Sequence, residues 1–342
     1  MRVIVIGGTG AFASRVTQDC LDAGDEVLVV TRGQRTGSLT AQQPGLTWLH
    51  ADRNQLTDHR EQLEAFAPDA VVDAICFNPD HARQLVDLFP DVPRVVMIST
   101  VDVYGEEVGA DLVTEDWQPN PMTPYAVGKA HAERVVLAGL GGNATIIRPS
   151  HMLGRGFLTN GLWGRTEHVV ARLRAGLPVA VLDGGRGVIT PVYAGDVATW
   201  VRASFALPRA DGEVFNAVGG WRVTMRDYVQ AIADHLGVPA SITSVPSPIV
   251  REALAMPTQF AFHRPYSSAK ATTLLGHRPA GTLPSMIAET VAAMPVRDLG
   301  SPEGLPEALL AANAAEDALH ELAARQEAEL AEVLKATDPR IG

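Results

Sequence analysis

The stretch that decides the fold is RVIVIGGTGAFA, at residues 2–13. Its first part, residues 2–6, is a continuous run of mostly β-branched side chains, which predicts a strand buried on both faces of a sheet. Three glycines follow within residues 7–10, and residues 12–23 predict a helix that ends at a glycine. A strand, a glycine-rich turn and a helix in this order predict the first unit of an α/β fold.

The same alternation continues along the chain. Further strands are predicted at residues 26–31, 46–50, 70–74, 94–98 and 145–147, with helices at 80–89 and 124–137. Strands alternating with helices imply right-handed βαβ units, and hence a doubly wound parallel sheet of the Rossmann type over residues 1–150.

Beyond residue 150 the pattern changes, because glycines and prolines become frequent and the strand candidates, at 179–182 and 214–218, are short. We expect a smaller substrate domain at residues 151–299. It is interleaved with the first domain, because elements near 190–218 return to the sheet. Residues 300–342 form a tail rich in Ala, Glu and Leu.

The tail carries a helical stripe. Its members, at three- and four-residue spacing, are Leu319, Leu322, Gln326, Leu330 and Val333. We favour a helix docked on its own subunit over a coiled coil between subunits.

Composition limits the partners. The chain has 342 residues and a net charge of −11, and an acidic surface repels phosphate backbones, so we expect no nucleic acid partner. Only Cys20 and Cys76 are present, with neither a disulfide framework nor metal-ligand spacing, so we expect no metal. No apolar segment approaches a signal or membrane-spanning length. We expect a cytoplasmic protein with a small-molecule substrate, no membrane contact, and a homodimer as the assembly to test.

The glycine turn lies where a dinucleotide fingerprint must lie, between a strand and a helix. Gly7 permits the tight turn and Gly10 lets the backbone approach a pyrophosphate, while Ala13 replaces the third glycine of the pattern. Exposed amides and the helix dipole favour the anionic pyrophosphate. The predicted cofactor contacts in this turn are Gly7, Thr9, Gly10, Ala11 and Phe12.

The end of the second strand indicates which dinucleotide binds. An acidic residue there would bond a free ribose 2′-hydroxyl, but the strand ends at Thr31 and Arg32 follows. Arg32 is suited to pair with a 2′-phosphate, and Arg35 to assist it, so we favour NADP over NAD. Asp52 follows the third strand and is placed to bond adenine.

Tyr125 and Lys129 lie four residues apart on a predicted helix and therefore share one face. A nearby cation favours the phenolate and lowers a tyrosine pKa toward the working range of an acid–base catalyst. A hydroxyl pair, Ser99 and Thr100, ends the strand that precedes this helix.

In its order of motifs, the chain resembles the extended short-chain dehydrogenases/reductases, also called the NAD-dependent epimerase/dehydratase family. The motifs span residues 1–295 and are GGTGAFA, STVDVYG, TPYAVGKAHAE, IIRPSHMLGRG, TPVYAGDVA, VFNAVGG and RPYSSAKATTLLGHRP. The resemblance implies hydride transfer between the nicotinamide and a substrate carbon.

The resemblance also implies roles for single residues. Tyr125 would exchange the proton of a carbonyl or carbinol, and Lys129 would hold the nicotinamide ribose and tune Tyr125. Thr100 would bond the reacting oxygen, with Ser99 as the alternative. The residues that would pass beside the nicotinamide are Pro149 and Ser150.

Departures from the family pattern concern the substrate. Ile189 stands where many nucleotide-sugar enzymes carry an arginine, and His151 where a substrate-binding asparagine is common. Asp102 is the one acid after the catalytic threonine, where sugar dehydratases usually carry a pair. It is either an auxiliary acid/base or a carboxylate that caps the next turn. His151 is either a proton relay or a hydrogen-bonded pocket histidine.

Three functions compete at this stage. The first is an NAD(P)-dependent oxidoreductase acting on a small polar or sugar-like substrate through the Tyr-Lys-Thr set. The second is a sugar or nucleotide-sugar epimerase or dehydratase with tightly bound NAD. The third is a non-catalytic, cofactor-binding regulatory protein. The intact catalytic set and the missing phosphate-binding arginine favour the first.

Overall fold

The computed structural model describes residues 1–10, 12–34, 39–40, 42–106, 108–109, 111–155, 158–165, 167–206, 212–254 and 258–337. Ala11 and Arg35, two predicted cofactor contacts, lie outside these residues.

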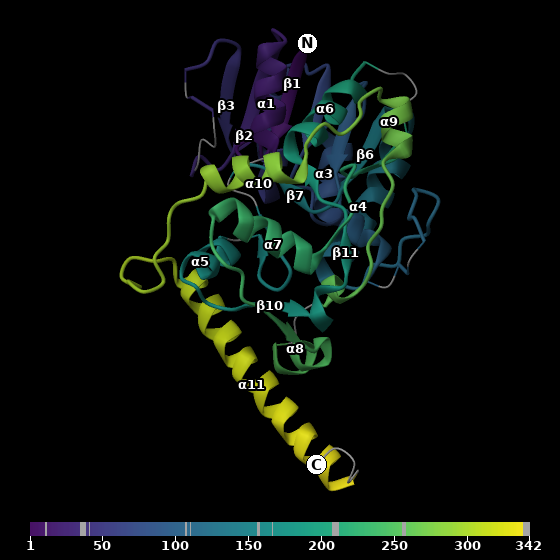
Figure 1. The fold of residues 1–342 in the computed structure, drawn as a ribbon. Helices are drawn as coiled ribbons and strands as arrows, with labels where there is room; N and C mark the ends of the chain where they lie inside the picture. Colours follow the sequence, from purple (N-terminus) through teal and green to yellow (C-terminus); the bar gives the residue numbers. More distant parts are fainter. Residues whose placement is uncertain are drawn as a thin grey trace.

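A seven-stranded, all-parallel sheet forms the centre of the molecule (Figure 1). Its strands, in spatial order, are β13 (Glu213–Ala217), β6 (Ala144–Pro149), β5 (Val95–Ile98), β4 (Ala70–Asp73), β1 (Arg2–Ile6), β2 (Glu26–Thr31) and β3 (Leu46–His50). The strand order reverses between β1 and β4. Ligands of open α/β sheets bind outside the carboxyl ends of the strands at such a switch point.

Helices cover both faces of this sheet, as the predicted doubly wound fold requires. In β1, Val3 and Val5 join the core under α1 (Ala13–Asp22) and α6 (Ala194–Ser204). Ile4 and Ile6 join the core on the other face, under α3 (Pro79–Leu88) and α4 (Pro124–Leu140). The alternation explains the unbroken apolar run of β1, because both of its faces are buried.

A second core lies beyond the carboxyl edge of the sheet and includes Ile189, Tyr228 and Leu319. Its strands are β7 (Met152–Leu153), β8 (Thr159–Asn160), β9 (Gly164–Arg165), β10 (Val179–Leu182), β11 (Val188–Ile189), β12 (Val192–Tyr193), β14 (Val223–Thr224) and β15 (Ile242–Val245). The remaining helices before the tail are α2 (Arg60–Ala65), α5 (His168–Arg174), α7 (Met225–Leu236), α8 (Ser247–Leu254), α9 (Ala269–Leu274) and α10 (Leu283–Ala292). Short 3-10 turns are η1 (Arg53–His59), η2 (Val101–Tyr104), η3 (Gly141–Asn143), η4 (Asp183–Gly185) and η6 (Gln259–Ala261).

The tail is one long helix, α11 (Glu307–Thr337), which runs away from the body toward the C-terminus (Figure 1). Its first half docks on its own chain, with Leu319 buried and Leu322 half-buried. The docking prediction is wrong for the second half, because Leu330 and Val333 are 59% and 57% exposed. The apolar stripe of the helix continues beyond the residues of α11 that pack against the rest of the chain. In the part of the chain that the structure describes, no helix is both long and apolar enough to cross a membrane.

Candidate active site

The glycine turn after β1 is built as the fingerprint predicts. Gly7 has a φ of 78°, its amide donates to the Val30 carbonyl at 2.8 Å, and the Gly10 amide closes the turn onto the Gly7 carbonyl at 3.1 Å. A Cβ on Gly7 would lie 2.9 Å from the Ile75 side chain. Glycine is therefore needed here both for the backbone conformation and for the close approach of the turn after β4.

Gly10 faces open space. A Cβ added there would meet only the Gly7 carbonyl within 4 Å, at 3.6 Å. Gly10 lines a cleft of about 1590 Å³ together with Gly7 and Thr9. A cleft this size exceeds an ordinary small-molecule pocket, and its open backbone at the start of α1 fits a dinucleotide pyrophosphate. Phe12, directly before α1, is buried in the core instead of facing the cleft, so its predicted contact would come from its backbone.

Arg32 and Asp52 both line this cleft, at the ends of β2 and β3. The Asp52 carboxylate accepts hydrogen bonds from the backbone and side-chain nitrogens of Asn54, at 2.8 and 2.9 Å. The Asn54 hydrogen bonds, followed by the positive charge of Arg32, lower the pKa of Asp52. The sequence-predicted pair thus lies at one end of the cleft, where an adenosine would lie.

Tyr125 and Lys129 lie one turn apart at the start of α4. Thr123 caps this helix by accepting from the Ala126 amide at 3.2 Å. The Tyr125 side chain is 43% exposed, whereas Lys129 is 1% exposed. Gly128, between them, is the point at which α4 meets the turn after β4, because a Cβ there would lie 2.5 Å from the Phe77 carbonyl oxygen.

The Lys129 ammonium is held from two sides. It donates to the Ile98 carbonyl at the end of β5, at 2.6 Å. It also lies 4.7 Å from the centre of the Phe77 ring and 5.9 Å from that of the Tyr125 ring. Aromatic faces attract a cation over these distances, which helps to offset its burial. Phe77 lines the large cleft, and its ring centre is 6.3 Å from that of Tyr125, so the catalytic pair lies next to this part of the cleft wall.

Thr100 lies two residues after the end of β5, where it caps η2. Its hydroxyl oxygen accepts from the Asp102 amide at 3.2 Å, which leaves the hydroxyl proton without an acceptor among the described residues. The Ser99 hydroxyl is buried, and the described part of the chain offers it no hydrogen-bond partner. Both hydroxyls remain candidates to hydrogen-bond the reacting oxygen of the substrate. Thr100 is the better oriented of the two, because it caps the next turn.

Asp102 does not cap the next turn, and its auxiliary acid/base role stays a prediction. Thr100, not Asp102, caps the next turn, and the Asp102 carboxylate pairs with Arg264 at 2.6 Å. Arg264 is fully buried and also donates to the Gly105 carbonyl at 3.1 Å. The pair ties η2 to the second core. Arg264 is thus a buried cation that holds the Asp102 carboxylate beside the turn after β5.

His151 and the segment before it pack against the second core and the backbone around Thr190. The His151 ring is buried, with its centre 5.0 Å from that of Phe260. Pro149 ends β6, and the Ser150 hydroxyl donates to the Thr190 carbonyl. Ile189 is fully buried in the second core. The position at which many nucleotide-sugar enzymes carry an arginine is thus occupied by an apolar side chain of the core.

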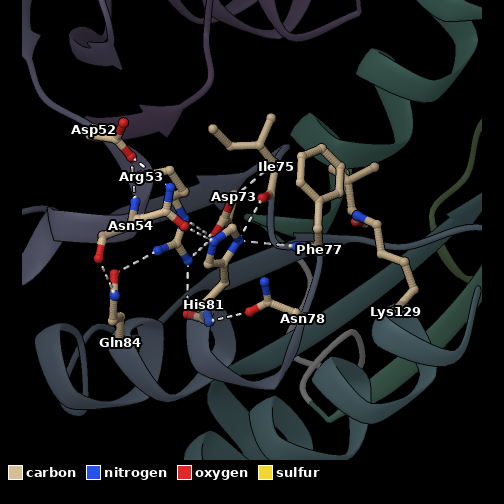
Figure 2. A network of polar contacts seen from close by, with 11 residues as sticks. Asp52, Arg53, Asn54, Asp73, Ile75, Phe77, Asn78, His81, Gln84 and Lys129 are labelled. Carbon is tan, nitrogen blue, oxygen red and sulfur yellow. Dashed lines mark hydrogen bonds and ion pairs between the residues drawn. The ribbon is translucent and has the colours of Figure 1, made fainter. Parts of the chain in front are cut away.

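Sequence reasoning missed a polar network at the ends of β3 and β4 (Figure 2). Arg53 donates to the buried Asp73 carboxylate at 2.6 and 3.1 Å, and the His81 ring contacts Asn54 and the turn that holds Phe77. The available signal was local. Asn78 followed by a proline predicts the start of a helix, which would have placed His81 in the first turn beside the site.

The opposite wall of the cleft was also missed. Tyr193, Arg155 and Glu289 line it, and the Tyr193 hydroxyl donates to the Glu289 carboxylate at 2.6 Å. Burial, then this carboxylate, raises the pKa of Tyr193 to about 12, so the phenol stays protonated.

Residues 3–217 match the model of the NAD dependent epimerase/dehydratase family. The chain belongs to this family. Membership confirms the resemblance drawn from the motifs and, with the seven-stranded sheet, the predicted Rossmann-type fold. It also confirms an enzyme that depends on a nicotinamide dinucleotide.

Curated relatives include both reductases and dehydratases. The 2′-dehydrokanamycin reductase of Streptomyces kanamyceticus is 25% identical over 257 residues, which cover 74% of this chain and 72% of the relative. The dTDP-glucose 4,6-dehydratase of an Actinoplanes species is 26% identical over 331 residues, covering 85% and 97%.

Among solved structures, dTDP-glucose 4,6-dehydratase from Bacillus anthracis, in complex with NAD, superposes with a TM-score of 0.73. It is 19% identical and covers 86% of this chain and 96% of its own. At this identity the likeness shows the fold alone.

Proposed function

We propose that this enzyme is an NADP(H)-dependent oxidoreductase that interconverts a carbonyl and a carbinol on a small polar or sugar-like molecule. The observation that carries the proposal is the arrangement at the start of α4. There a half-exposed Tyr125 lies one helical turn from a buried Lys129, whose ammonium is 5.9 Å from the Tyr125 ring centre. Lys129 bonds the Ile98 carbonyl, two residues before Thr100, whose hydroxyl proton has no acceptor among the described residues.

Each side chain has one task in this proposal. When bound, the nicotinamide supplies or accepts the hydride. Tyr125 gives its proton to the carbonyl oxygen during reduction and takes it back during oxidation. Lys129 stabilises the phenolate that remains and moves from the Ile98 carbonyl toward the ribose. Thr100 donates its hydrogen bond to the same substrate oxygen and fixes its position.

The cofactor contacts proposed are Gly7, Thr9 and Gly10 for the pyrophosphate and Asp52 for adenine. Arg32, which follows Thr31 at the end of β2 in place of an acidic residue, is assigned to the 2′-phosphate. A guanidinium forks onto phosphate oxygens, which supports NADP over NAD.

The competing function is a sugar epimerase or dehydratase that retains NAD through every turnover. The dehydratase relative favours it. Two observations oppose it. Asp102, the residue available as an extra acid, is bound to Arg264, and the position of the phosphate-binding arginine is the buried Ile189.

The test is to release the cofactor from purified protein by denaturation and to identify it by mass, then to follow NADPH oxidation with a panel of sugar-like carbonyl compounds. We expect little retained cofactor and NADPH-dependent reduction. Stoichiometric, tightly retained NAD with no net oxidation of NADPH would replace this proposal with the epimerase or dehydratase.

We also propose the division into residues 1–150, 151–299 and 300–342, and a cytoplasmic location, which the two buried free thiols Cys20 and Cys76 favour. Size-exclusion chromatography with light scattering tests the homodimer.

A further inference from the structure

The His81 imidazole lies between Asp52 and Asn54 on one side and Phe77 and Lys129 on the other (Figure 2). Its Nε2 lies 3.0 Å from the Asn54 side-chain oxygen, and its Nδ1 lies 3.1 Å from the Ile75 carbonyl oxygen and 3.3 Å from the Phe77 amide nitrogen, both in the turn after β4. Burial, and then the Arg53 charge, lowers the pKa of His81, which favours a neutral ring. One small side chain thus contacts two segments that line the cleft on either side of it.

The backbone of His81 is fixed at both of its polar groups. Its amide donates to the Asn78 side chain at 2.9 Å, and its carbonyl accepts from Arg53 at 2.8 Å. Arg53 is in turn held by Asp73 at the end of β4. The ring therefore has a defined position relative to the sheet, and it transfers that position to whatever it contacts.

On the adenosine side the contact leads to Asp52. Asn54 turns its side-chain oxygen to His81 and its side-chain nitrogen to Asp52. The Asn54 backbone amide holds the same Asp52 oxygen, and the second carboxylate oxygen has no hydrogen bond to the described residues. His81 thereby fixes which way the Asn54 amide points, and Asn54 fixes the adenine-binding carboxylate.

On the catalytic side the contact leads to Lys129. The Phe77 amide is in the turn after β4, and the Phe77 ring is the nearest described aromatic face to the Lys129 ammonium. The Phe77 carbonyl lies against Gly128 of α4. A shift of this turn would therefore move both the ring beside Lys129 and the helix that carries Tyr125.

We propose that His81 is a positioning residue that sets both ends of the cofactor site at once, through Asn54 to Asp52 and through Phe77 to Lys129. The inference rests on the proposed function, because it assigns these ends to the adenosine and the nicotinamide ribose. It predicts that a substitution that replaces only one of the two ring nitrogens will affect ligand binding at only one end of the cofactor site.

Two amide substitutions make that separation. His81→Asn places an amide group near the Nδ1 position, where it faces the Ile75 carbonyl and the Phe77 amide of the turn after β4, but it does not reach Asn54. His81→Gln places an NH₂ group near the Nε2 position and can donate to Asn54, but its contact with the Phe77 amide is lost. Both variants bury one side-chain amide, so we expect them to lose similar amounts of stability. Thermal unfolding of the two variants measures this loss.

Titration with 2′,5′-ADP, which carries only the adenosine half, and with NADPH reads the two ends without any substrate. We expect His81→Asn to weaken both ligands by the same factor, roughly 3- to 10-fold for one lost hydrogen bond. His81→Gln should bind 2′,5′-ADP as the wild type does and bind NADPH roughly 3- to 10-fold more weakly. Adding His81→Asn to an Asn54→Ala background should not weaken 2′,5′-ADP binding further.

Two results overturn the inference. If the ratio of the two affinities is the same in both variants, His81 has a merely structural role, while NADPH binding by the wild type would keep the proposed function intact. If the wild type binds neither 2′,5′-ADP nor NADPH, the proposed function fails, and the inference fails with it.

Discussion

Arg53 donates two hydrogen bonds to one oxygen of Asp73, at 2.6 and 3.1 Å, and both side chains are buried. The pair joins the end of β3 to the end of β4, next to the point at which the strand order reverses. Because Arg53 itself lines the cofactor cleft, the pair fixes part of the cleft wall.

The first prediction concerns this pair. Asp73→Ala leaves the Arg53 charge buried without its partner and should reduce the free energy of unfolding by about 3–5 kcal/mol. Asp80→Ala, which removes a carboxylate from an exposed pair with Arg83, is the control and should cost about 0–1 kcal/mol. Denaturant unfolding measures both. Equal losses would show that the buried pair is no more important than a surface one.

The second prediction concerns pH. Burial lowers the pKa of His168 from its ordinary 6.5 to about 4. Between these values the unfolded chain binds a proton that the folded chain does not, so stability is lost as the pH falls through this window.

For the wild type, the part of that loss due to His168 should be about 2 kcal/mol between pH 7.5 and pH 5. His168→Gln should flatten the dependence, whereas His131→Gln, at an exposed position, should leave it unchanged. Urea unfolding at the two pH values tests this. A His168→Gln protein with the full wild-type slope would refute the assignment.

The third prediction concerns the tail. Glu316 of α11 is buried, pairs with the fully buried Arg172, and accepts from the Trp163 ring nitrogen at 2.6 Å. Ending the chain after Ala324 keeps these contacts and should leave the melting temperature nearly unchanged. Ending it after Gly300 leaves Arg172 without Glu316 and should cost about 3–5 kcal/mol. Equal melting temperatures for the two truncations would contradict this account of α11.

The fourth prediction concerns cofactor choice. Arg32→Asp removes a cation and places a carboxylate where the 2′-phosphate is proposed to bind. The Kd for NADPH should rise roughly 10- to 100-fold, while that for NADH should change little. Arg222→Asp makes the same charge change at an exposed position that does not line the cleft. Fluorescence titration with both cofactors decides, and an unaltered preference in Arg32→Asp would remove Arg32 from the site.

Much of the fold was predictable because the burial of a strand or helix determines the pattern of its apolar residues. The strands at residues 2–6, 26–31 and 179–182 have the predicted bounds, since both faces of each are covered and their apolar runs are unbroken. The tail shows the limit of this reasoning. Leu319 and Leu330 belong to one stripe in the sequence, yet only Leu319 has a body to pack against.

The candidate site was predictable where chemistry fixes the spacing, as in the Tyr125–Lys129 turn. It was not predictable where function depends on partners far apart in the chain. Asp102 gave no sign that Arg264 would bind it, and His81 gave none that it would contact Asn54. Such pairs follow from the packing of separate strands, which a single sequence does not record.

The central claim is that Tyr125 supplies the proton in a hydride-transfer reaction. Tyr125→Phe keeps the ring and its contact with Phe77 but removes the hydroxyl, so NADPH affinity should be retained. Lys129→Met, in contrast, should weaken NADPH binding as well as turnover, because Lys129 is proposed to hold the ribose.

The most direct measurement is the turnover number of Tyr125→Phe, with the carbonyl substrate found in the NADPH panel, alongside its Kd for NADPH. The account predicts a turnover reduced about 10²- to 10⁴-fold at an unchanged Kd. A Tyr125→Phe enzyme with near-normal turnover would contradict it.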